Sequence, residues 1–456
     1  MSLILTKEQL KFTREQLKKN EIERRAVEAA IWGMPLVNFD AMRQAYFNDA
    51  NAQYNDIIYY PKFADWKYQA TTPNNTTNYA MFFCNLKQGP IVVEVPPEEE
   101  AALWGSLIDS WHLPIIDIGV KGIDEGKGGK FLLLPPGYQE NVPRGYIPVQ
   151  FSTNNIYSLL RIVPKTKEVE ETENVVKFIK KFKIYPLSSE PKSSNFIDMT
   201  NVLFNGLANF DERFYVSLAR MISEEPIYER DLAIMGQLLS LGIGKDLTFN
   251  PDEAMTEILR KSIAEALVFM CEKFKNDGVK WWENLQWQSI LKNTGKSFFS
   301  FLDPEKCLFI DERSGMFVAA FGPSKTPAPN LYIKSYRDSN GDDLDGTNTY
   351  CLRIPPHAKL PKNEFWSINV YDYYSSAFIR EATVVGLDSY NQNLQENEDG
   401  SIDLFFSPEP PAGKESNWIS TEKDKPFFLI FRLYFVDYSV KNKEFQWTFN
   451  DLEKVD

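Results

Sequence analysis

Two segments decide the fold of this chain: residues 365–372, with the sequence FWSINVYD, and residues 427–435, with the sequence FFLIFRLYF. In the first segment apolar side chains occupy every second position, which is the period of a β-strand with one face in a core. In the second segment both faces are apolar, with Arg432 as the exception. Strands that are apolar on nearly both faces lie deep in packed sheets. The two segments therefore predict a β-sandwich in the C-terminal part of the chain.

The spacing of apolar residues divides the chain into four regions. Helical spacing is found in an N-terminal segment, residues 1–54, and again in residues 165–297. Short strands punctuated by Gly and Pro are found in residues 55–164 and 298–456. A chain of 456 residues exceeds what one core usually supports. We therefore predict a multi-domain α and β fold, with two antiparallel, jelly-roll-like β-sandwich subdomains and two helical subdomains.

The first helical run extends from Thr6 to Tyr46, and Gly33 and Pro35 are expected to break it. Met1–Leu3 leads into this polar helical stretch and not into a secretory signal. No apolar run approaches membrane-spanning length, so we expect a soluble protein without a membrane span. The cellular localisation is left open by the sequence. Export is expected if Met1–Leu3 replaces a natural leader.

The charge of the chain argues against one class of partner. Lys and Arg number 50 against 63 Asp and Glu, which gives a net charge of −13. Such a chain repels polyphosphate unless it has a local basic patch, and no basic run of convincing length occurs. We therefore predict no nucleic-acid partner, and keep a small-molecule or carbohydrate ligand and a homo-oligomer as the expected partners. Aromatic residues make up 14% of the chain; they can line a ligand cleft, although β-rich cores explain most of them.

Metal and cofactor chemistry have little support in the sequence. The two histidines, His112 and His357, and four scattered cysteines cannot supply the usual transition-metal ligands. No Gly-x-Ser-x-Gly elbow, phosphate loop or dinucleotide fingerprint occurs, so no metal and no cofactor is predicted. The acidic loop 338–345 offers oxygen ligands of the kind that calcium prefers, but its spacing fits no EF-hand and is typical of a hairpin.

Several motifs resemble two families of unknown function. Residues 55–164 resemble the domain of unknown function 1254. The match rests on Trp32–Leu36 (WGMPL), Pro73–Tyr79 (PNNTTNY), Gly89–Pro96 (GPIVVEVP) and Gly129–Leu134 (GKFLLL). The C-terminal part resembles its usual companion, the domain of unknown function 1214, through Asp338–Gly341 (DSNG), Leu344–Asn348 (LDGTN), Phe365–Ser367 (FWS), Asp399–Ser401 (DGS) and Asn417–Trp418 (NW).

The resemblance covers most of the chain. It implies two β-sandwich subdomains with helical subdomains between them, and members of these families are often exported. It implies no established activity. One departure is visible: the family usually has Asp after the paired asparagines, where this chain has Thr76. A function that depends on that carboxylate would be missing here.

Two groups of polar residues are candidates for a site. Asn74, Asn75 and Tyr79 cluster just before a strand, where Asn side chains can hold a water or a substrate hydroxyl, although they also serve as turn residues. His112 could act as a general base with Asp109 orienting it. A lone His beside Trp in apolar surroundings is more often a hydrogen-bonded structural residue.

Arg432 gives the sharpest single signal. An unpaired guanidinium inside so apolar a strand would be very costly, so it must pair with a carboxylate, with carbonyls or with a ligand anion. We expect a structural pair with Asp372 or Asp403, which lie on strands of the same region. If Arg432 instead faces a cleft without a carboxylate, its charge awaits an anionic ligand. Arg161 and Arg380 also raise the question of which group pairs with the guanidinium, but less sharply than Arg432.

Three functions are compatible with these residues. The first is a non-metal enzyme acting on a small organic or sugar-like substrate in a cleft between the sandwiches. The second is a binding module, in which Trp366, Tyr371 and Trp418 would line an aromatic cleft for a carbohydrate or an apolar ligand. The third is a structural or interaction protein that oligomerises without catalysis. The sequence favours a ligand in a cleft and leaves open whether the protein is an enzyme.

Overall fold

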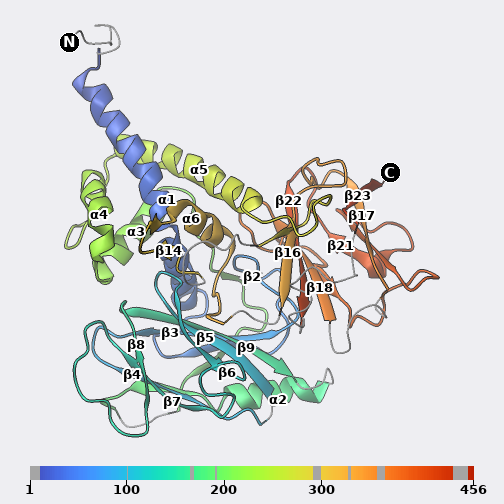
Figure 1. The fold of residues 1–456 in the computed structure, drawn as a ribbon, viewed down its shortest axis with the longest axis horizontal. Coiled ribbons are helices and arrows are strands. Elements are labelled where there is room, and N and C mark those ends of the chain that lie inside the picture. Colours follow the sequence, from blue (N-terminus) through green and yellow to red (C-terminus); the bar gives the residue numbers. More distant parts are fainter. Residues whose placement is uncertain are drawn as a thin grey trace.

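The computed structural model describes residues 11–99, 101–164, 169–189, 193–290, 299–326, 330–356, 365–434 and 450–455. Figure 1 shows three parts: an N-terminal β unit, a group of helices above it, and a C-terminal β unit beside both. The helices are α1 Arg14–Asn48, α2 Val169–Ile179, α3 Arg213–Glu224, α4 Leu232–Leu238, α5 Glu253–Asn276 and α6 Ile310–Ala319. The protein therefore has a mixed α and β fold with several sheets. His357 and Phe435 lie outside the described residues.

The N-terminal β unit is built from two sheets. Their strand orders are β11-β1-β3-β9-β5-β6 and β10-β4-β7-β8. The strands are β1 Ile57–Tyr60, β3 Asn78–Asn85, β4 Ile91–Val95, β5 Ala101–Asp109, β6 Pro114–Gly119, β7 Gly129–Leu134, β8 Ile147–Gln150, β9 Asn155–Pro164, β10 Lys183–Pro186 and β11 Phe196–Asp198. One hydrophobic cluster contains side chains of both sheets, such as Phe82 and Phe131, together with Phe178 of α2. Burial of this shared cluster holds the two sheets and α2 together.

The C-terminal β unit also has two main sheets. Their strand orders are β13-β16-β22-β18-β19 and β21-β20-β17-β23. The strands are β13 Gln288–Ser289, β16 Leu331–Ser335, β17 Thr349–Ile354, β18 Phe365–Asp372, β19 Gly386–Asp388, β20 Ile402–Ser407, β21 Trp418–Ser420, β22 Phe427–Tyr434 and β23 Glu453–Val455. The short pairs β2 Tyr68–Gln69 with β12 Phe204–Asn205, and β14 Leu302–Asp303 with β15 Cys307–Leu308, lie outside these sheets.

The two faces of β22 are both buried, as its sequence predicts. Phe431 and Leu433 belong to the cluster between the two C-terminal sheets. On the opposite face, Phe428 and Ile430 belong to a second cluster, which also contains residues of α1, α3, α5 and α6 and of the N-terminal strands β1, β3 and β9. This second cluster joins all three parts of the molecule, so one face of β22 looks toward the N-terminal β unit and the helices.

The expectation that all strands pair antiparallel is wrong at the sheet edges. Among the described strands, the pairs β1–β11, β2–β12, β7–β8 and β20–β21 are parallel. A parallel partner requires a connection that returns to the starting end of the first strand. The chain between β7 and β8, residues 135–146, makes such a return without a helix. Strands β10 to β13 also arise within residues 165–297, where the sequence predicts helices.

The expected break at Gly33 and Pro35 is also wrong, because α1 continues through both residues. The helix begins with a capping box, in which Thr13 and Gln16 satisfy each other's backbone N–H groups. Its second half is almost fully buried against the other helices. A Cβ at Gly33 would lie 2.6 Å from Leu218 Cδ1 of α3, so glycine allows the two helices to approach. Tertiary burial thus outweighs the hydrogen bond that Pro35 removes.

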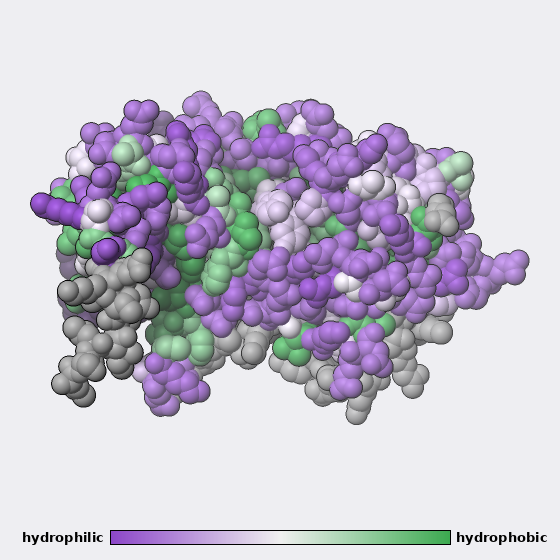
Figure 2. All heavy atoms as spheres, turned by 90° about the horizontal axis from the view of Figure 1, so that it is seen from above, coloured by the Kyte–Doolittle hydropathy of each residue, from purple (hydrophilic) through white to green (hydrophobic). Residues whose placement is uncertain are grey.

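One face of the surface is drawn in Figure 2. It is mainly hydrophilic, with hydrophobic side chains exposed in smaller areas. Among the described helices, none combines the length and the apolar character that a membrane crossing requires.

Candidate binding site between the two β units

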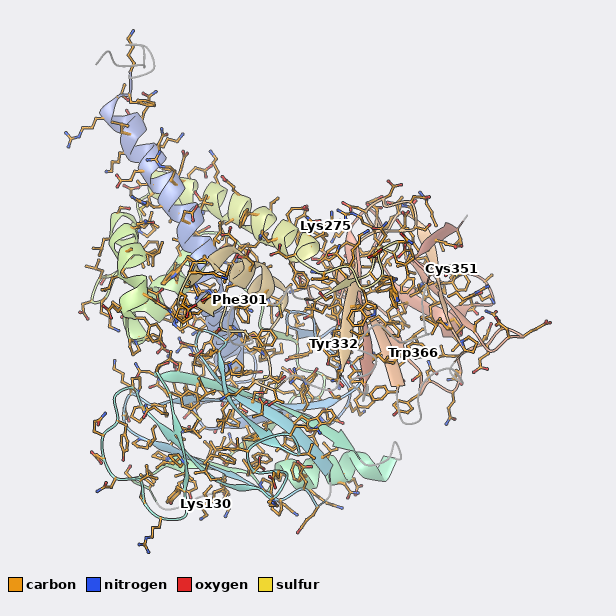
Figure 3. The ribbon with its side chains drawn as sticks, in the orientation of Figure 1. Lys130, Lys275, Phe301, Tyr332, Cys351 and Trp366 are labelled. Carbon is orange, nitrogen blue, oxygen red and sulfur yellow. The ribbon has the colours of Figure 1, made fainter. Side chains whose placement is uncertain are left out.

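A cavity of about 420 Å³ lies where the two β units and the helices meet. Its N-terminal wall comes from β5, β6 and β9, and its C-terminal wall comes from β16 and β22. The segment after α6, residues 320–326, lies along it, and Thr72 contributes from a loop of the N-terminal unit. Figure 3 shows Tyr332, one of its lining residues, on the side of the C-terminal unit that faces the rest of the molecule, with Cys351 farther away.

Strand alternation places Arg432 at this cavity. Arg432 lies on the same face of β22 as Ile430, and both line the cavity. Its neighbours across the ladders are Tyr332 on β16 and Ser367 on β18. The centre of its guanidinium lies 5.3 Å from the centroid of the Tyr332 ring. Only 3% of the residue is exposed, so the charge is almost completely removed from solvent.

Arg432 has hydrogen-bond partners but no carboxylate among the described residues. Its NH1 donates to Asn369 Oδ1 at 2.7 Å. Its NH2 donates to the Tyr371 hydroxyl at 2.7 Å and to the carbonyl of Thr72 at 3.1 Å. An arginine stays protonated in proteins, and a tyrosine with its ordinary or a raised pKa is neutral at neutral pH. Burial raises the pKa of Tyr371, so the positive charge of Arg432 is not balanced by these partners.

The expected pair with Asp372 or Asp403 is therefore wrong. Asp372 is opposite Phe427 in the β18–β22 ladder, whereas Arg432 is opposite Ser367, which separates the two by about 17 Å along the strands. Asp372 instead accepts a hydrogen bond from Ser375 Oγ at 2.7 Å. Asp403 lies in the other sheet of the C-terminal unit and accepts from Arg353 Nε at 2.7 Å.

The loop Thr72–Thr76 carries the candidate asparagines into the same network. Asn75 Oδ1 accepts from Asn369 Nδ2 at 2.8 Å, which connects Asn75 to Arg432. Asn74 Nδ2 donates to the Tyr434 hydroxyl at 2.6 Å. Thr72 itself has a φ of 42°, which is rare for a β-branched residue. The network thus links the N-terminal loop to two strands of the C-terminal unit.

Thr76, which follows the paired asparagines, completes the turn. Its N–H and its hydroxyl both donate to Asn74 Oδ1, at 3.0 and 2.8 Å. Asn74 therefore acts as a turn residue, which is one of the two roles considered from the sequence. It also contacts the C-terminal unit.

Arg161 is the second cation with a described position in the cavity wall. It lies on β9, opposite Tyr79 on β3. Its NH2 donates to the carbonyl of Gly322 at a long 3.4 Å. The only carboxylate among the described lining residues is Asp117, and its oxygens accept from Ser106 Oγ at 2.8 Å and from two backbone N–H groups, at 2.9 and 2.6 Å. Asp117 is thus already engaged by neutral donors, and Arg161 and Arg432 outnumber this single carboxylate in the described lining.

His112 and Asp109 lie elsewhere, in a buried turn. Asp109 Oδ1 accepts from the backbone N–H groups of Trp111 and Leu113, both at 2.9 Å. The ring of His112 stacks on Phe317 at 4.6 Å, and the pKa of His112 falls to about 3 because burial disfavours its charged form, which the backbone of Pro35 offsets in part. Burial also raises the pKa of Asp109 to about 7. The Asp109 carboxylate therefore orients a turn and not the imidazole, and a catalytic role for the pair stays a prediction.

The remaining candidates are dispersed. Trp366 is fully buried between the two C-terminal sheets, where its ring stacks with Phe431. Trp418 is buried and donates from Nε1 to the carbonyl of Ser407. Arg380 is exposed on the surface. Of the three aromatic residues expected to line one cleft, the structure brings only Tyr371 to the Arg432 network.

The acidic loop 338–345 forms hairpin contacts. Asp338 Oδ1 accepts from the backbone of Asn340 and Asp342, and Asp343 pairs with Lys275 at 2.6 Å. Within the described part of the chain, no three His, Cys, Asp or Glu side chains come close enough to hold a metal ion.

Two residues of the site escaped the sequence interpretation. Asn369, which accepts a hydrogen bond from Arg432, lies in residues 365–372. It could have been singled out as a polar side chain in an otherwise apolar, buried strand. Tyr332 gave no signal, because an aromatic residue in a strand is ordinary.

The fold and the cavity define a protein of two β-rich units that enclose a ligand-sized space with helices at its side. Family models match two parts of the chain: "Protein of unknown function (DUF1254)" at residues 54–186 and "Protein of unknown function (DUF1214)" at residues 329–437. The two matches fall in the order that the sequence motifs predict, and the chain is therefore similar to proteins that combine these two domains.

A solved structure with a TM-score above 0.5 gives a likeness in fold. The VPA0106 protein from Vibrio parahaemolyticus matches with a TM-score of 0.54 and 17% identity, over 95% of this chain and 100% of that chain. An uncharacterised protein from Burkholderia cenocepacia matches with a TM-score of 0.41 and 11% identity, over 96% of each chain. No curated protein matches the sequence.

Proposed function

We propose that the protein binds a small organic anion with an apolar body in the cavity between its β units. The observation that carries the proposal is Arg432, a buried guanidinium at the cavity with no carboxylate partner among the described residues. A buried charge without a counter-ion is costly, and a ligand carboxylate, sulfonate or phosphate supplies one. We also propose that each pair of facing sheets is a jelly-roll-like sandwich. Two such sandwiches would give the cavity two rigid walls.

The chemistry of the lining supports an organic acid over a neutral sugar. A sugar offers many hydroxyl donors and needs acceptors, but Asp117 is already engaged by three donors. The lining instead supplies donors from Arg432 and Arg161, and apolar surface from residues such as Phe321 and Ile430. A cavity with mostly apolar walls and a few oriented polar groups is typical of a small-molecule site.

The proposal covers binding and makes no claim of turnover. A general base or nucleophile needs a titratable group that reaches the ligand. Asp117 is held by three donors, and His112 is buried among aromatic rings outside the lining. Carriage or sensing of an organic acid is therefore the simplest function that uses this cavity.

Calorimetric titration with octanoate and with octanol tests the proposal, because the two ligands share an apolar chain and differ in charge. We expect octanoate to bind the wild type at least about tenfold more tightly than octanol, since a charge-assisted hydrogen bond forms only with the acid. In Arg432→Met this preference should disappear. In Arg432→Lys it should survive in part, because the charge remains without the planar fork.

A matched control is Arg353→Met, which removes an exposed arginine that pairs with Asp403 on the far sheet. This variant should bind octanoate as the wild type does. Equal affinity of the wild type for octanoate and octanol, or an unchanged octanoate affinity in folded Arg432→Met, would contradict the proposal.

A further inference from the structure

Arg161 is a second arginine at the same cavity, on the wall that the N-terminal β unit contributes. It lies in the middle of its sheet, with Tyr79 of β3 on one side and Trp104 of β5 on the other. Its hydrogen bond to the carbonyl of Gly322 is 3.4 Å long, and no described carboxylate forms an ion pair with it. Most of its five N–H donors therefore have no described acceptor.

The charges around the cavity do not balance. Arg161 and Arg432 come from different β units, and the exposed Lys121 adds a third cation at the lining. Against these three stands Asp117, the only carboxylate among the described lining residues. In a chain with a net charge of −13, such a local excess of positive charge is unusual. Cations that face a shared cavity repel each other unless an anion lies between them.

The rest of the lining is largely apolar. Leu331 and Ile430 contribute from the C-terminal unit, Ile118 contributes from the N-terminal unit, and Met316 and Phe321 contribute from α6 and the segment after it. One inorganic ion would leave this surface without a partner, whereas a linker of methylene or aromatic groups would cover it.

We infer that the ligand carries two acidic groups, one bound by Arg432 and one by Arg161, joined by an apolar linker. The inference rests on the proposed function and specifies the ligand class of that same site. A dicarboxylate of this kind contacts one arginine from each β unit, so both units are required for full affinity. Arg161 then determines the preference for a diacid over a monoacid.

The test compares octanedioate with octanoate, two acids of equal chain length, by calorimetry on the intact chain. Hexanedioate and decanedioate are tested as well. Their different chain lengths mean that the distance between the two arginine side chains does not have to be assumed. At least one diacid should bind the wild type about tenfold more tightly than the monoacid of the same length. In Arg161→Met this advantage should vanish, so that octanedioate and octanoate bind within about twofold of each other. In Arg432→Met both affinities should fall.

The outcomes separate the two claims. If octanoate binds in an Arg432-dependent way and no diacid binds more tightly, the inference fails and the proposed function stands. If a diacid advantage persists in folded Arg161→Met, the inference also fails, because the second acid group binds elsewhere. If neither octanoate nor any diacid binds the wild type, both claims fail. Arg161→Lys should restore part of the diacid preference, which a merely structural role for the guanidinium would not produce.

Discussion

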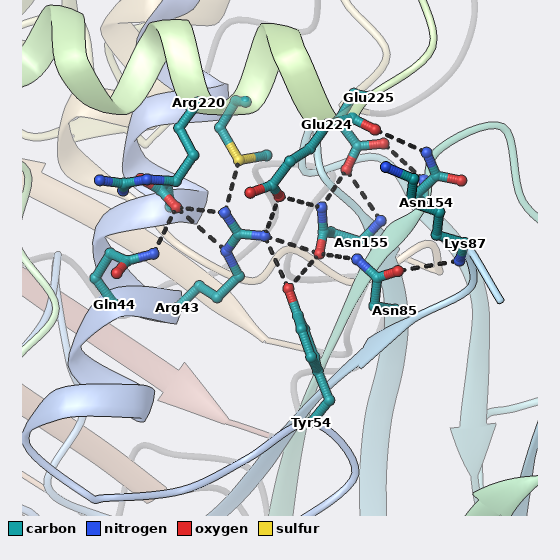
Figure 4. Close-up of polar contacts among 12 residues, drawn as sticks. Arg43, Gln44, Tyr54, Asn85, Lys87, Asn154, Asn155, Arg220, Glu224 and Glu225 are labelled. Carbon is teal, nitrogen blue, oxygen red and sulfur yellow. Dashed lines mark hydrogen bonds and ion pairs between the residues drawn. The ribbon is translucent and has the colours of Figure 1, made fainter.

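Two buried arginines in this molecule have opposite surroundings. Arg43 of α1 is 2% exposed and Arg432 of β22 is 3% exposed. Arg43 NH2 lies 2.7 Å from Asp40 Oδ1, and its NH1 pairs with Glu224 of α3. Figure 4 shows this network, in which Tyr54 and Asn155 accept further hydrogen bonds from Arg43. Arg432 has only neutral partners among the described residues and borders a cavity.

Under the proposed function, this difference distinguishes a structural arginine from one that binds a ligand. Burial acts against the charge of Arg43, but Asp40 and Glu224 outweigh it and raise its pKa. The counter-ions of Arg43 thus belong to the fold, and its guanidinium ties α1 to α3 and β9. Under the proposed function, the counter-ion of Arg432 comes from a ligand. Burial of an arginine therefore says little about its role until its partners are known.

The largest effect on stability is expected from Arg43→Met. The substitution leaves Asp40 and Glu224 without their shared cation, and breaking a buried pair in this way typically costs about 3–5 kcal/mol. Chemical denaturation should show this loss, while the folded fraction binds octanoate as the wild type does. A loss below about 1 kcal/mol would mean that Arg220, which also contacts Asp40, replaces Arg43.

Arg432→Met should cost less stability and remove binding. It leaves neutral acceptors, Asn369 and Tyr371, without a donor, which costs about 1–3 kcal/mol. The contrast with Arg43→Met can be measured by denaturation and calorimetry on both variants. Should Arg432→Met be the more destabilised of the two while its octanoate affinity is retained, the assignment of roles would be reversed.

His112 extends the comparison to a buried base that has neither a carboxylate partner nor a cavity within the described part of the chain. Its pKa falls from 6.5 to about 3 through burial, so between these values the unfolded chain binds a proton that the folded chain does not. Stability should therefore fall as the pH decreases from 6.5 toward 3, by up to about 1.4 kcal/mol per pH unit from this group.

The variant His112→Asn isolates this term, because Asn does not titrate and tolerates the φ of 62° at this position. The pKa of Asp109, raised to about 7, gives a slope of opposite sign in both proteins, so the difference between them reports His112. Parallel pH–stability curves for wild type and variant would show that His112 takes up a proton in the folded state.

The smallest effect is expected from Asn75→Ala, which acts on Arg432 through Asn369. Loss of the 2.8 Å hydrogen bond from Asn369 should cost about 1 kcal/mol of stability. Octanoate affinity should fall by a few fold, and the preference for octanoate over octanol should remain, because the charge of Arg432 is untouched. A complete loss of that preference would place Asn75 in direct contact with the ligand.

More of the strand structure than of the candidate site could be predicted from the sequence. Alternation in residues 427–434 predicts both buried faces of β22 and the burial of Arg432, because strand period and burial are local properties. The partner of Arg432 could not be predicted. Thr72, whose carbonyl it contacts, lies 360 positions away. Asp372 and Asp403 were expected instead because they lie on strands of the same C-terminal region.

The prediction for α1 at Pro35 failed for the same reason, because it considered only local sequence. The break predicted there follows from local rules, and burial against α3, α5 and α6 overrides it. The asparagines of the loop Thr72–Thr76 could be singled out by residue type, but their contact with Arg432 through Asn369 depends on how the two β units pack.

The most direct test of the central claim is a crystal structure of the protein with octanoate bound. The account predicts the carboxylate within hydrogen-bond distance of the Arg432 guanidinium and the alkyl chain along the apolar lining near Ile430. An octanoate carboxylate that lies outside this cavity, with Arg432 bonded only to Asn369, Tyr371 and the loop carbonyls, would contradict it.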